Sequence, residues 1–175
     1  MHGVREEILE RQAVLLGLPC IKVPIPSPCP NEVYEARMLE ALGRARGDGV
    51  SHVIFGDLFL EDIRAYREKM LAPTGLKCVF PLWGLNTAKL AGEMIESGLR
   101  ALLVCVDPRH LPPSFAGRWF DKQLLADLPS GVDPCGENGE FHTLVTAGPM
   151  FSGPLDVRPG VVVEREGFVF SDALA

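Results

Sequence analysis

Apolar and polar positions follow two alternating patterns along the first 107 residues. Some segments repeat apolar side chains at the spacing of an amphipathic helix, and the segments between them are short β-prone or continuously apolar runs. The helical spacing predicts helices over residues 4–16, 31–46, 60–71 and 86–99. The runs predict strands over residues 20–25, 52–56, 77–83 and 100–107. Asn31 is the expected N-cap of the second helix, and Asn86 or Thr87 that of the fourth.

Helices that alternate with strands are typical of an α/β fold with an open, mostly parallel sheet covered by helices on both faces. After Asp107 the pattern changes. A proline-rich loop and a short helix over 120–129 lead to β-prone segments at 141–147 and 160–170, separated by Gly and Pro turns. We therefore expect an α/β part over residues 1–107 and a β-containing C-terminal part over 108–175, which can belong to one continuous domain.

Composition narrows the class of protein. The 175 residues carry a formal net charge of -6, without the basic surface that nucleic-acid binding requires, so no nucleic-acid partner is expected. The longest strongly apolar run, ALLVCV at 101–106, is too short to span a membrane. The five cysteines include no CxxC pair, and the N-terminus lacks the apolar core of a signal peptide. These features predict a cytoplasmic protein with reduced thiols.

The segment CGENGEFHTLV, residues 135–145, places two carboxylates, an amide and a histidine in one turn before a strand. Glycines at 136 and 139 suit a tight backbone around a small polar ligand. The alternative is a solvated hairpin turn, because Asn138-Gly139 is a strong hairpin signal. His142 lies in a strand-like run, where a hydrogen-bonded core histidine is commoner than a metal ligand, so no metal site is expected here.

Polar residues also follow a predicted strand at residue 56. In open parallel sheets, ligands bind beyond the carboxyl ends of the strands. Gly56 allows a close approach to the backbone, and Asp57 can accept from a ribose hydroxyl or hold a hydrated magnesium ion. Glu61, Asp62 and Arg64 follow at the start of the next helix. The alternative is that Asp57 caps this helix and the other three form its solvated first turn.

Two further features carry two interpretations each. Asp107 and Arg109 follow a buried strand and are either ligand groups or an internal salt bridge. Trp83, in the segment FPLW, is either a core residue or an aromatic ligand wall. The chain contains no GxxxxGK[ST] or strand-linked GxGxxG loop, no GxSxG elbow and no HExxH. P-loop, serine hydrolase and zincin functions therefore receive no support.

Three segments extend this reading: HVIFGDLFLEDIRAYREKML, GLKCVFPLWG and PCGENGEFHTLVTAGPMF, in this order. Together they resemble the diphthine-ammonia ligase family of PP-loop ATP pyrophosphatases, also called adenine nucleotide alpha hydrolase-like proteins. The resemblance runs from about residue 2 to about residue 157. It implies a HUP/Rossmann-like sheet, ATP with accompanying Mg2+, and adenylation of a carboxylate followed by attack of ammonia. In the best-known members the carboxylate belongs to the diphthine of elongation factor 2, in diphthamide synthesis.

The resemblance also implies roles for individual residues. Gly56, Asp57, Glu61, Asp62 and Arg64 match the nucleotide side of the family. Glu137, Asn138 and Glu140 are the expected catalytic residues of the acceptor and ammonia side. The substrate-side residues are expected to be Trp83, Gly136, Gly139, His142 and Thr143.

The sequence departs from the family pattern in two places. The SGGKDS-type loop that holds the ATP phosphates is not in this chain, which predicts an N-terminally truncated sheet with an open edge that a homodimer would cover. GENGEFHT replaces the more usual EGGEYET-like segment, which favours a small-molecule or protein carboxylate other than diphthine. An alternative function is a catalytically incomplete nucleotide- or metabolite-binding module of the same fold. A metal-dependent hydrolase is a third and weaker hypothesis.

Overall fold

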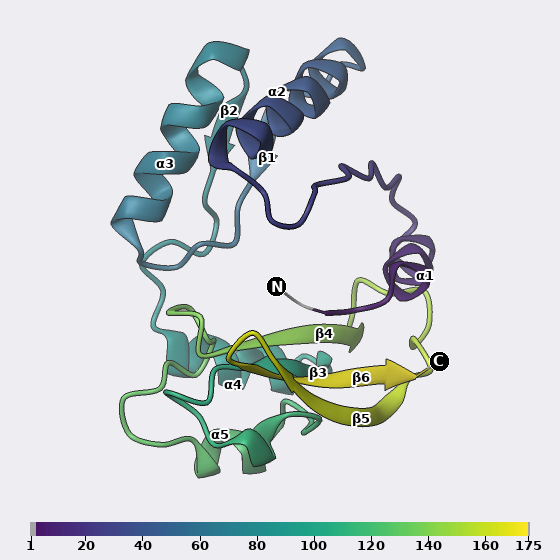
Figure 1. Ribbon diagram of the computed structural model, residues 1–175, viewed down its shortest axis with the longest axis vertical. Helices are drawn as coiled ribbons and strands as arrows, with labels where there is room; N and C mark the ends of the chain where they lie inside the picture. The colour runs from purple at the N-terminus through teal and green to yellow at the C-terminus, as the bar shows by residue number, and fades with distance from the viewer. Residues whose placement is uncertain (1–2, 175) are drawn as a thin grey trace. The chain divides into compact units, whose positions relative to one another are not determined.

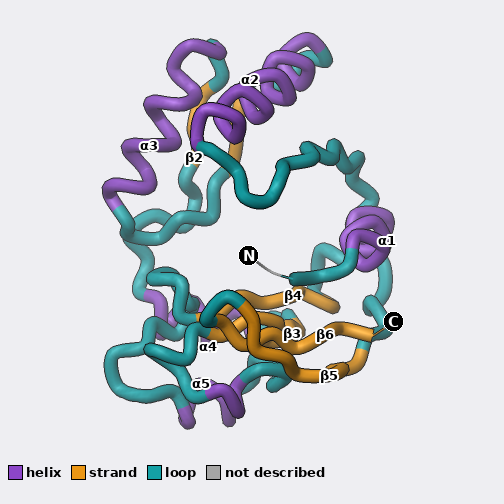
Figure 2. The backbone as a smooth tube through the Cα atoms, viewed as in Figure 1, coloured by secondary structure: helices purple, strands orange, loops and turns teal. Residues whose placement is uncertain are grey.

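The computed structural model describes residues 3–174 and divides into two compact units. Unit 1 comprises Met1–Cys20 and Asn86–Ala175, and unit 2 comprises Ile21–Leu85. Figure 1 traces the chain through both units, and Figure 2 shows their helices, strands and connecting loops. The expected change of character at residue 107 lies within unit 1, so the division into a nucleotide part and a substrate part stays a prediction.

Unit 2 is a small α/β unit built around two parallel strands. Its elements are α2 (Asn31–Gly47), β1 (His52–Ile54), α3 (Glu61–Leu71), the 3-10 turn η1 (Ala72–Thr74) and β2 (Lys77–Val79). In the β1–β2 pair, Val53 lies opposite Cys78. Met70, Leu71 and Leu76 form the buried core beneath these strands, because the apolar stripe of α3 turns toward them.

Unit 1 is built around an antiparallel sheet of four strands in the order β4-β3-β6-β5. Its strands are β3 (Arg100–Val106), β4 (Phe141–Ala147), β5 (Arg158–Arg165) and β6 (Phe168–Leu174). Its helices are α1 (Glu6–Leu16), α4 (Thr87–Glu96), the 3-10 turn η2 (Pro113–Phe115) and α5 (Lys122–Asp127). The strand β3 lies in the middle of the sheet and is buried from Ala101 to Val106 (Figure 1).

Two apolar clusters hold unit 1 together, one on each face of the sheet. Leu103 of β3 packs with Ala91 of α4 and Leu124 of α5 on one face. On the other face, Leu102 packs with Ile8 of α1. Adjacent residues of a strand point to opposite faces, so β3 supplies both clusters from one continuous apolar run.

The α/β class predicted from the sequence is confirmed, and helices cover both faces of the larger sheet. The prediction of a mostly parallel sheet is wrong for the described strands, because only β1 and β2 pair in parallel. The relative direction of two neighbouring strands depends on the connection between them. The loop and short helix between β3 and β4 bring the chain back antiparallel, and β5–β6 is a tight hairpin.

Two local predictions also differ from the structure. Residues 20–25 form no strand, and their apolar side chains Ile21 and Ile25 are exposed. The N-cap of α2 is Pro30 rather than Asn31, whose side chain instead donates to Glu35 inside the helix. Asn86 is confirmed as the N-cap of α4, because its side chain accepts a hydrogen bond from the Lys89 N–H.

Candidate functional site

The loop that precedes β4 is organised by two buried carboxylates. Glu140 is 2% exposed, and its two oxygens accept hydrogen bonds from the Asp133 N–H (2.9 Å), the Asn138 N–H (3.0 Å) and the Asn138 side-chain amide (2.9 Å). Asp133 is 8% exposed and accepts from the N–H groups of Cys135 and Glu137, both at 3.0 Å. The two side chains therefore fix the backbone of residues 133–140, which we call the 133–140 loop.

Two glycines make the tight path of this loop possible. Gly136 has φ +69, and a Cβ at this position would lie 2.8 Å from the Phe141 carbonyl oxygen. Gly139 has φ +85, and its N–H donates to the Gly136 carbonyl at 3.0 Å. The turn is not the hairpin that Asn138-Gly139 can form, because β4 pairs with β3, which ends at Val106. The hairpin interpretation is therefore wrong, and the role of the loop in holding a ligand stays a prediction.

Charge within the loop follows from these hydrogen bonds. Burial alone would raise the pKa of Glu140, but hydrogen bonds from Asp133 and Asn138 outweigh it and hold the pKa below its ordinary value. Burial and the nearby Asp133 and Glu137 raise the pKa of the Cys135 thiol to about 11. The loop thus carries a buried anion at Glu140 and a protonated thiol at neutral pH, whereas Asn138 is exposed and Glu137 is half-buried.

The strand-end pair Asp107 and Arg109 lies beside this loop. The Asp107 N–H donates to the Glu140 carbonyl at 2.9 Å, so the end of β3 is joined to the start of β4. The Arg109 guanidinium donates to both Asp107 oxygens, at 2.5 to 3.1 Å. These bonds lower the pKa of Asp107 to about 2, although the carboxylate is buried. The pair forms the internal salt bridge that the sequence left open, with the Arg109 side chain 74% exposed.

His142 and Thr143 continue from the loop into β4. His142 is half-buried and lies opposite Cys105 in the sheet, as expected for a histidine in a strand. No group of three or more His, Cys, Asp or Glu side chains within residues 3–174 could hold a metal ion. Thr143 is also half-buried, opposite Leu103.

In unit 2, the predicted nucleotide-side residues lie in the loop after β1 and at the start of α3. Asp57 does not cap α3, since Leu60 occupies the N-cap position without a side-chain bond. The Asp57 carboxylate instead accepts from Arg67 at 3.4 Å, and Arg67 lies 4.9 Å above the Phe55 ring. Gly56 is exposed. Glu61 and Asp62 are exposed in the first turn of α3.

Arg64 lies against two aromatic rings of unit 2. Its guanidinium carbon is 4.9 Å from the Phe80 ring centre and 4.7 Å from that of Trp83, and its Nε donates to Glu68 at 3.0 Å. The rings of Phe80 and Trp83 meet edge to face. Trp83 therefore packs against the guanidinium of Arg64 in this structure, and its role as an aromatic ligand wall stays a prediction.

Sequence reasoning did not single out Asp133 and Arg67. Asp133 lies directly before Pro134 and two residues before Cys135, whose N–H it accepts. An Asp side chain that bonds the backbone two residues later is typical of an Asx turn, so the local sequence does indicate this role. Arg67 has no such signal. Its contact with Asp57 depends on the bend between β1 and α3, which local periodicity does not specify.

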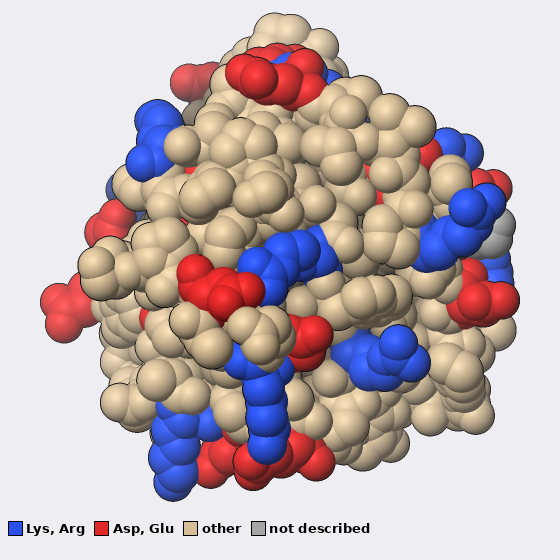
Figure 3. All heavy atoms as spheres, turned by 90° about the horizontal axis from the view of Figure 1, so that it is seen from below, with Lys and Arg blue, Asp and Glu red and all other residues tan. Residues whose placement is uncertain are grey.

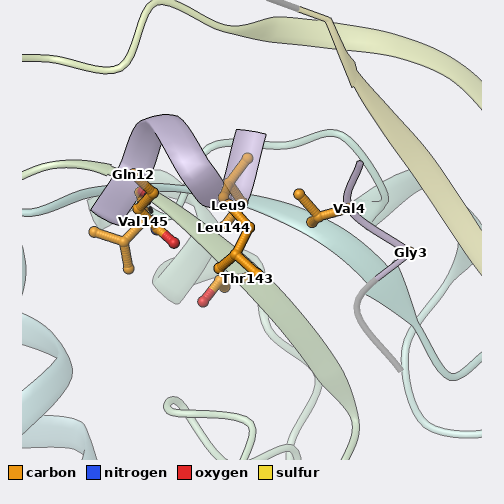
Figure 4. Close-up of a pocket in the computed structure, with 7 residues that line it drawn as sticks. All are labelled: Gly3, Val4, Leu9, Gln12, Thr143, Leu144 and Val145. Atoms are coloured by element: carbon orange, nitrogen blue, oxygen red, sulfur yellow. Dashed lines mark hydrogen bonds between the residues drawn. The ribbon is translucent and has the colours of Figure 1, made fainter. Parts of the chain in front are cut away.

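A cavity of about 410 Å3 lies between α1 and β4 in unit 1 (Figure 4). Its described lining residues come from the segment before α1, from α1 itself and from β4: Gly3, Val4, Leu9, Gln12, Thr143, Leu144 and Val145. Thr143 is the predicted site residue that the cavity includes. The Gln12 side-chain amide donates to the Val145 carbonyl at 2.8 Å and closes one end of the exposed β4 edge.

The prediction that the chain has no nucleic-acid partner stays a prediction. On the face drawn in Figure 3, Lys and Arg side chains are interspersed with Asp and Glu rather than gathered in one basic area. No helix within residues 3–174 has the length and apolar character needed to cross a membrane.

Comparison with known proteins gives consistent matches. Residues 86–171 match the family described as the diphthamide synthase C-terminal domain. Proteins named diphthine–ammonia ligase are similar to parts of the chain. The one from Schizosaccharomyces pombe is 34% identical over 102 residues, 56% of this chain and 17% of that protein. The one from Danio rerio is 34% identical over 110 residues, 59% of this chain and 42% of that protein.

The Homo sapiens protein of the same name is 32% identical over 95 residues, 51% of this chain and 36% of its own length. The chain thus spans less than half of the length of these curated relatives. The matched family segment includes the whole 133–140 loop, Asp107 and Arg109.

Proposed function

Since the chain belongs to the diphthine–ammonia ligase family, we propose that it carries the acceptor and ammonia side of an ATP-dependent carboxylate–amine ligase. One observation carries this proposal: the 133–140 loop, inside the matched family segment, is held by two buried carboxylates. A loop fixed in this way can hold a small cation such as ammonium without reorganising during the reaction. ATP is the proposed second substrate.

The proposed reaction has two steps. The acceptor carboxylate attacks the α-phosphorus of ATP and pyrophosphate leaves, giving an acyl adenylate. Ammonia then forms a bond to the acyl carbon, and the bond between that carbon and the AMP oxygen breaks. The nitrogen loses a proton as the amide forms, so the second step needs a group that binds ammonium and accepts a proton.

In this proposal Glu137 and Asn138 face the nitrogen. The Asn138 Nδ2 is committed to Glu140, which leaves the Oδ1 as an acceptor for an ammonium N–H. Glu137 supplies the carboxylate that accepts the proton. Glu140, expected to be catalytic, and Asp133 act in this scheme as positioning residues, because their carboxylates hold backbone N–H groups of the loop.

We further propose that unit 2 contributes the nucleotide side. Gly56 leaves its backbone open, Asp57 is oriented by Arg67, and Arg64 is a cation held by Phe80 and Trp83. Glu61 and Asp62 add acceptors at the first turn of α3. A single carboxylate paired with an arginine does not make a protein-held magnesium site, so Mg2+ is proposed only as the ion that accompanies ATP.

Calorimetry with AMP and Mg-ATP on the 175-residue chain tests the nucleotide part. We expect saturable binding that Asp57→Asn weakens and the exposed control Asp48→Asn leaves unchanged. Pyrophosphate release is then assayed with ammonium and diphthine-bearing elongation factor 2 as the first acceptor. Ammonium-dependent release whose kcat Glu137→Gln lowers by about tenfold or more supports the ligase, because the carboxylate is proposed to accept the proton in the reaction.

Other outcomes separate the alternatives. Binding without pyrophosphate release points to a nucleotide- or metabolite-binding module, the second function that the sequence suggests. Release with a small carboxylate but not with the elongation factor assigns a different acceptor. No binding of either nucleotide contradicts the proposal for this chain.

A further inference from the structure

The outer edge of β4 exposes backbone groups to the cavity beneath α1. In the sheet, Thr143 lies opposite Leu103 and Val145 opposite Ala101. Leu103 and Ala101 use their backbone groups on the other side, with residues 117, 118 and 120. Thr143 and Val145 therefore belong to pairs without mutual hydrogen bonds, so their N–H and C=O groups point away from β3.

Both ends of this exposed edge are closed. The Gln12 side-chain amide donates to the Val145 carbonyl at 2.8 Å. Figure 4 shows both residues among those that line the cavity. At the other end, Gly136 lies so close to the Phe141 carbonyl that a Cβ would be 2.8 Å from it. What remains open is the Thr143 N–H and C=O and the Val145 N–H, for which the described part of the chain provides no hydrogen-bond partner.

This short window favours a compact ligand over an added strand. A peptide strand would have to run past the Gln12 side chain and past Gly136 to pair with β4. The carbonyl of one residue and the N–H of the residue two positions later lie side by side on a strand edge. They match a ligand that presents an N–H donor beside an acceptor atom.

The walls of the cavity indicate the rest of the ligand. Val4 and Leu9 provide apolar surface on the α1 side, and none of the described lining residues is charged. Its volume of about 410 Å3 lies within the range of small-molecule sites. Apolar walls around a donor–acceptor edge suit an uncharged, flat ring that carries nitrogen atoms.

We propose that this cavity binds a flat nitrogen heterocycle of the purine-base class, through the Thr143 carbonyl and the Val145 N–H. The inference goes beyond the ligase proposal, because it uses neither the 133–140 carboxylates nor residues 56–64. Gln12 has a positioning role in it, since its bond to the Val145 carbonyl leaves only the donor of that residue for the ligand.

The test is an NMR titration of the 15N-labelled chain with adenosine, which is uncharged. We expect saturable shifts of the Val145 and Thr143 amide signals. N6,N6-dimethyladenosine lacks the donor for the Thr143 carbonyl, and 1-deazaadenosine lacks the acceptor for the Val145 N–H. Each analogue should bind about 2- to 12-fold more weakly, the range for one hydrogen bond.

A cavity-filling variant provides the protein-side test. Leu9→Trp should remove the shifts, while Val14→Trp, at a position 77% exposed on the same helix, should leave them intact. Binding of either analogue as tightly as adenosine, shifts that persist in Leu9→Trp, or no saturable shift would overturn the proposal. Displacement of adenosine by N-acetyl-dialanine amide would assign the edge to strand addition and also overturn it.

AMP and ATP carry the same base as adenosine, so the variants Leu9→Trp and Asp57→Asn are needed to tell the two sites apart. Adenosine shifts that Leu9→Trp removes and Asp57→Asn leaves intact, together with Mg-ATP binding that Asp57→Asn does not weaken, would leave only the cavity proposal standing. Mg-ATP binding that Asp57→Asn weakens, without saturable adenosine shifts, would leave only the ligase proposal standing.

Discussion

The Glu140 carboxylate and the Asp133 backbone N–H are joined by a 2.9 Å hydrogen bond across seven residues, and this bond closes the 133–140 loop. The Asp133 carboxylate in turn accepts hydrogen bonds from the N–H groups of Cys135 and Glu137, in the middle of the loop. The loop is therefore fixed by its own acidic side chains rather than by packing alone. Its rigidity depends on their charge.

Glu140→Gln should lower the free energy of unfolding of unit 1 by about 2 kcal/mol at pH 7, because an NH2 group then faces N–H donors. The pKa of Glu140 is below its ordinary value, so its contribution is complete above the ordinary pKa and is lost as pH falls through the lowered one. The difference from wild type should narrow below about pH 4. Denaturant unfolding followed by fluorescence in a Trp83→Phe background, which isolates Trp119 of unit 1, measures it.

The matched control for this variant is Glu164→Gln, on the exposed strand β5. It should change the free energy of unfolding by less than about 0.5 kcal/mol. A Glu140→Gln protein as stable as this control would contradict the structural role of Glu140.

Arg109→Ala should raise the pKa of Asp107 from about 2 to its ordinary value or above, since burial of the carboxylate then acts without the guanidinium. Because the pKa is lowered in the folded chain, the pair stabilises unit 1 above about pH 4 and ceases to do so as pH falls through 2. Carbon-detected NMR titration of the carboxyl group measures this pKa.

Arg109→Lys should give an intermediate pKa, because an ammonium lacks the fork that binds both oxygens. Arg158→Ala, at an exposed arginine of β5, should leave the Asp107 titration unchanged. An Asp107 pKa that stays near 2 in Arg109→Ala would show that another group stabilises this anion.

Arg64→Ala should lower the free energy of unfolding of unit 2 by about 1 kcal/mol, since it removes contacts with Phe80 and Trp83. The emission of Trp83 should shift as its ring becomes more exposed to water. Fluorescence in a Trp119→Phe background isolates Trp83, because the chain has two tryptophans. Arg44→Ala, which removes only an exposed ion pair with Glu40, should have no such effect.

Glu166→Asn should raise the free energy of unfolding of unit 1 by about 0.5 kcal/mol. Glu166 has φ 53 and Gly167 φ 78 in the two-residue turn between β5 and β6, a backbone that Asn-Gly adopts more readily. The Trp119 transition in denaturant measures the gain. Glu164→Asn, within the strand, should give no gain, and a loss of stability in Glu166→Asn would refute this account of the turn.

Local features of the fold were predictable wherever neighbouring residues determine them. The Asn86 cap of α4 depends on a residue three positions away, and the buried run of β3 follows from its composition. The pairing of a strand, in contrast, depends on residues that are distant in the sequence. Residues 20–25 have β-prone side chains, but no strand pairs with them. The antiparallel direction of β4 depends on the long connection between β3 and β4.

The same distinction applies to the candidate site. The many polar residues of 135–145 indicate an ordered loop, and in the structure hydrogen bonds to Asp133 and Glu140 fix its backbone. The interaction of Arg67 with Asp57 and that of Gln12 with Val145 join residues whose neighbourhood exists only in the folded chain. Periodicity cannot indicate such pairs, because neither partner is unusual in its own segment.

Unit 1 is interrupted in sequence, and this has a consequence for synthesis on the ribosome. Gln12 and Val145 are 133 residues apart, with the whole of unit 2 translated between them. At about 5–20 residues per second, α1 waits on the order of ten seconds for β4 to emerge. Unit 2 is continuous in sequence, so we expect it to fold first, while the apolar side of α1 stays available to a chaperone until the last strands leave the exit tunnel.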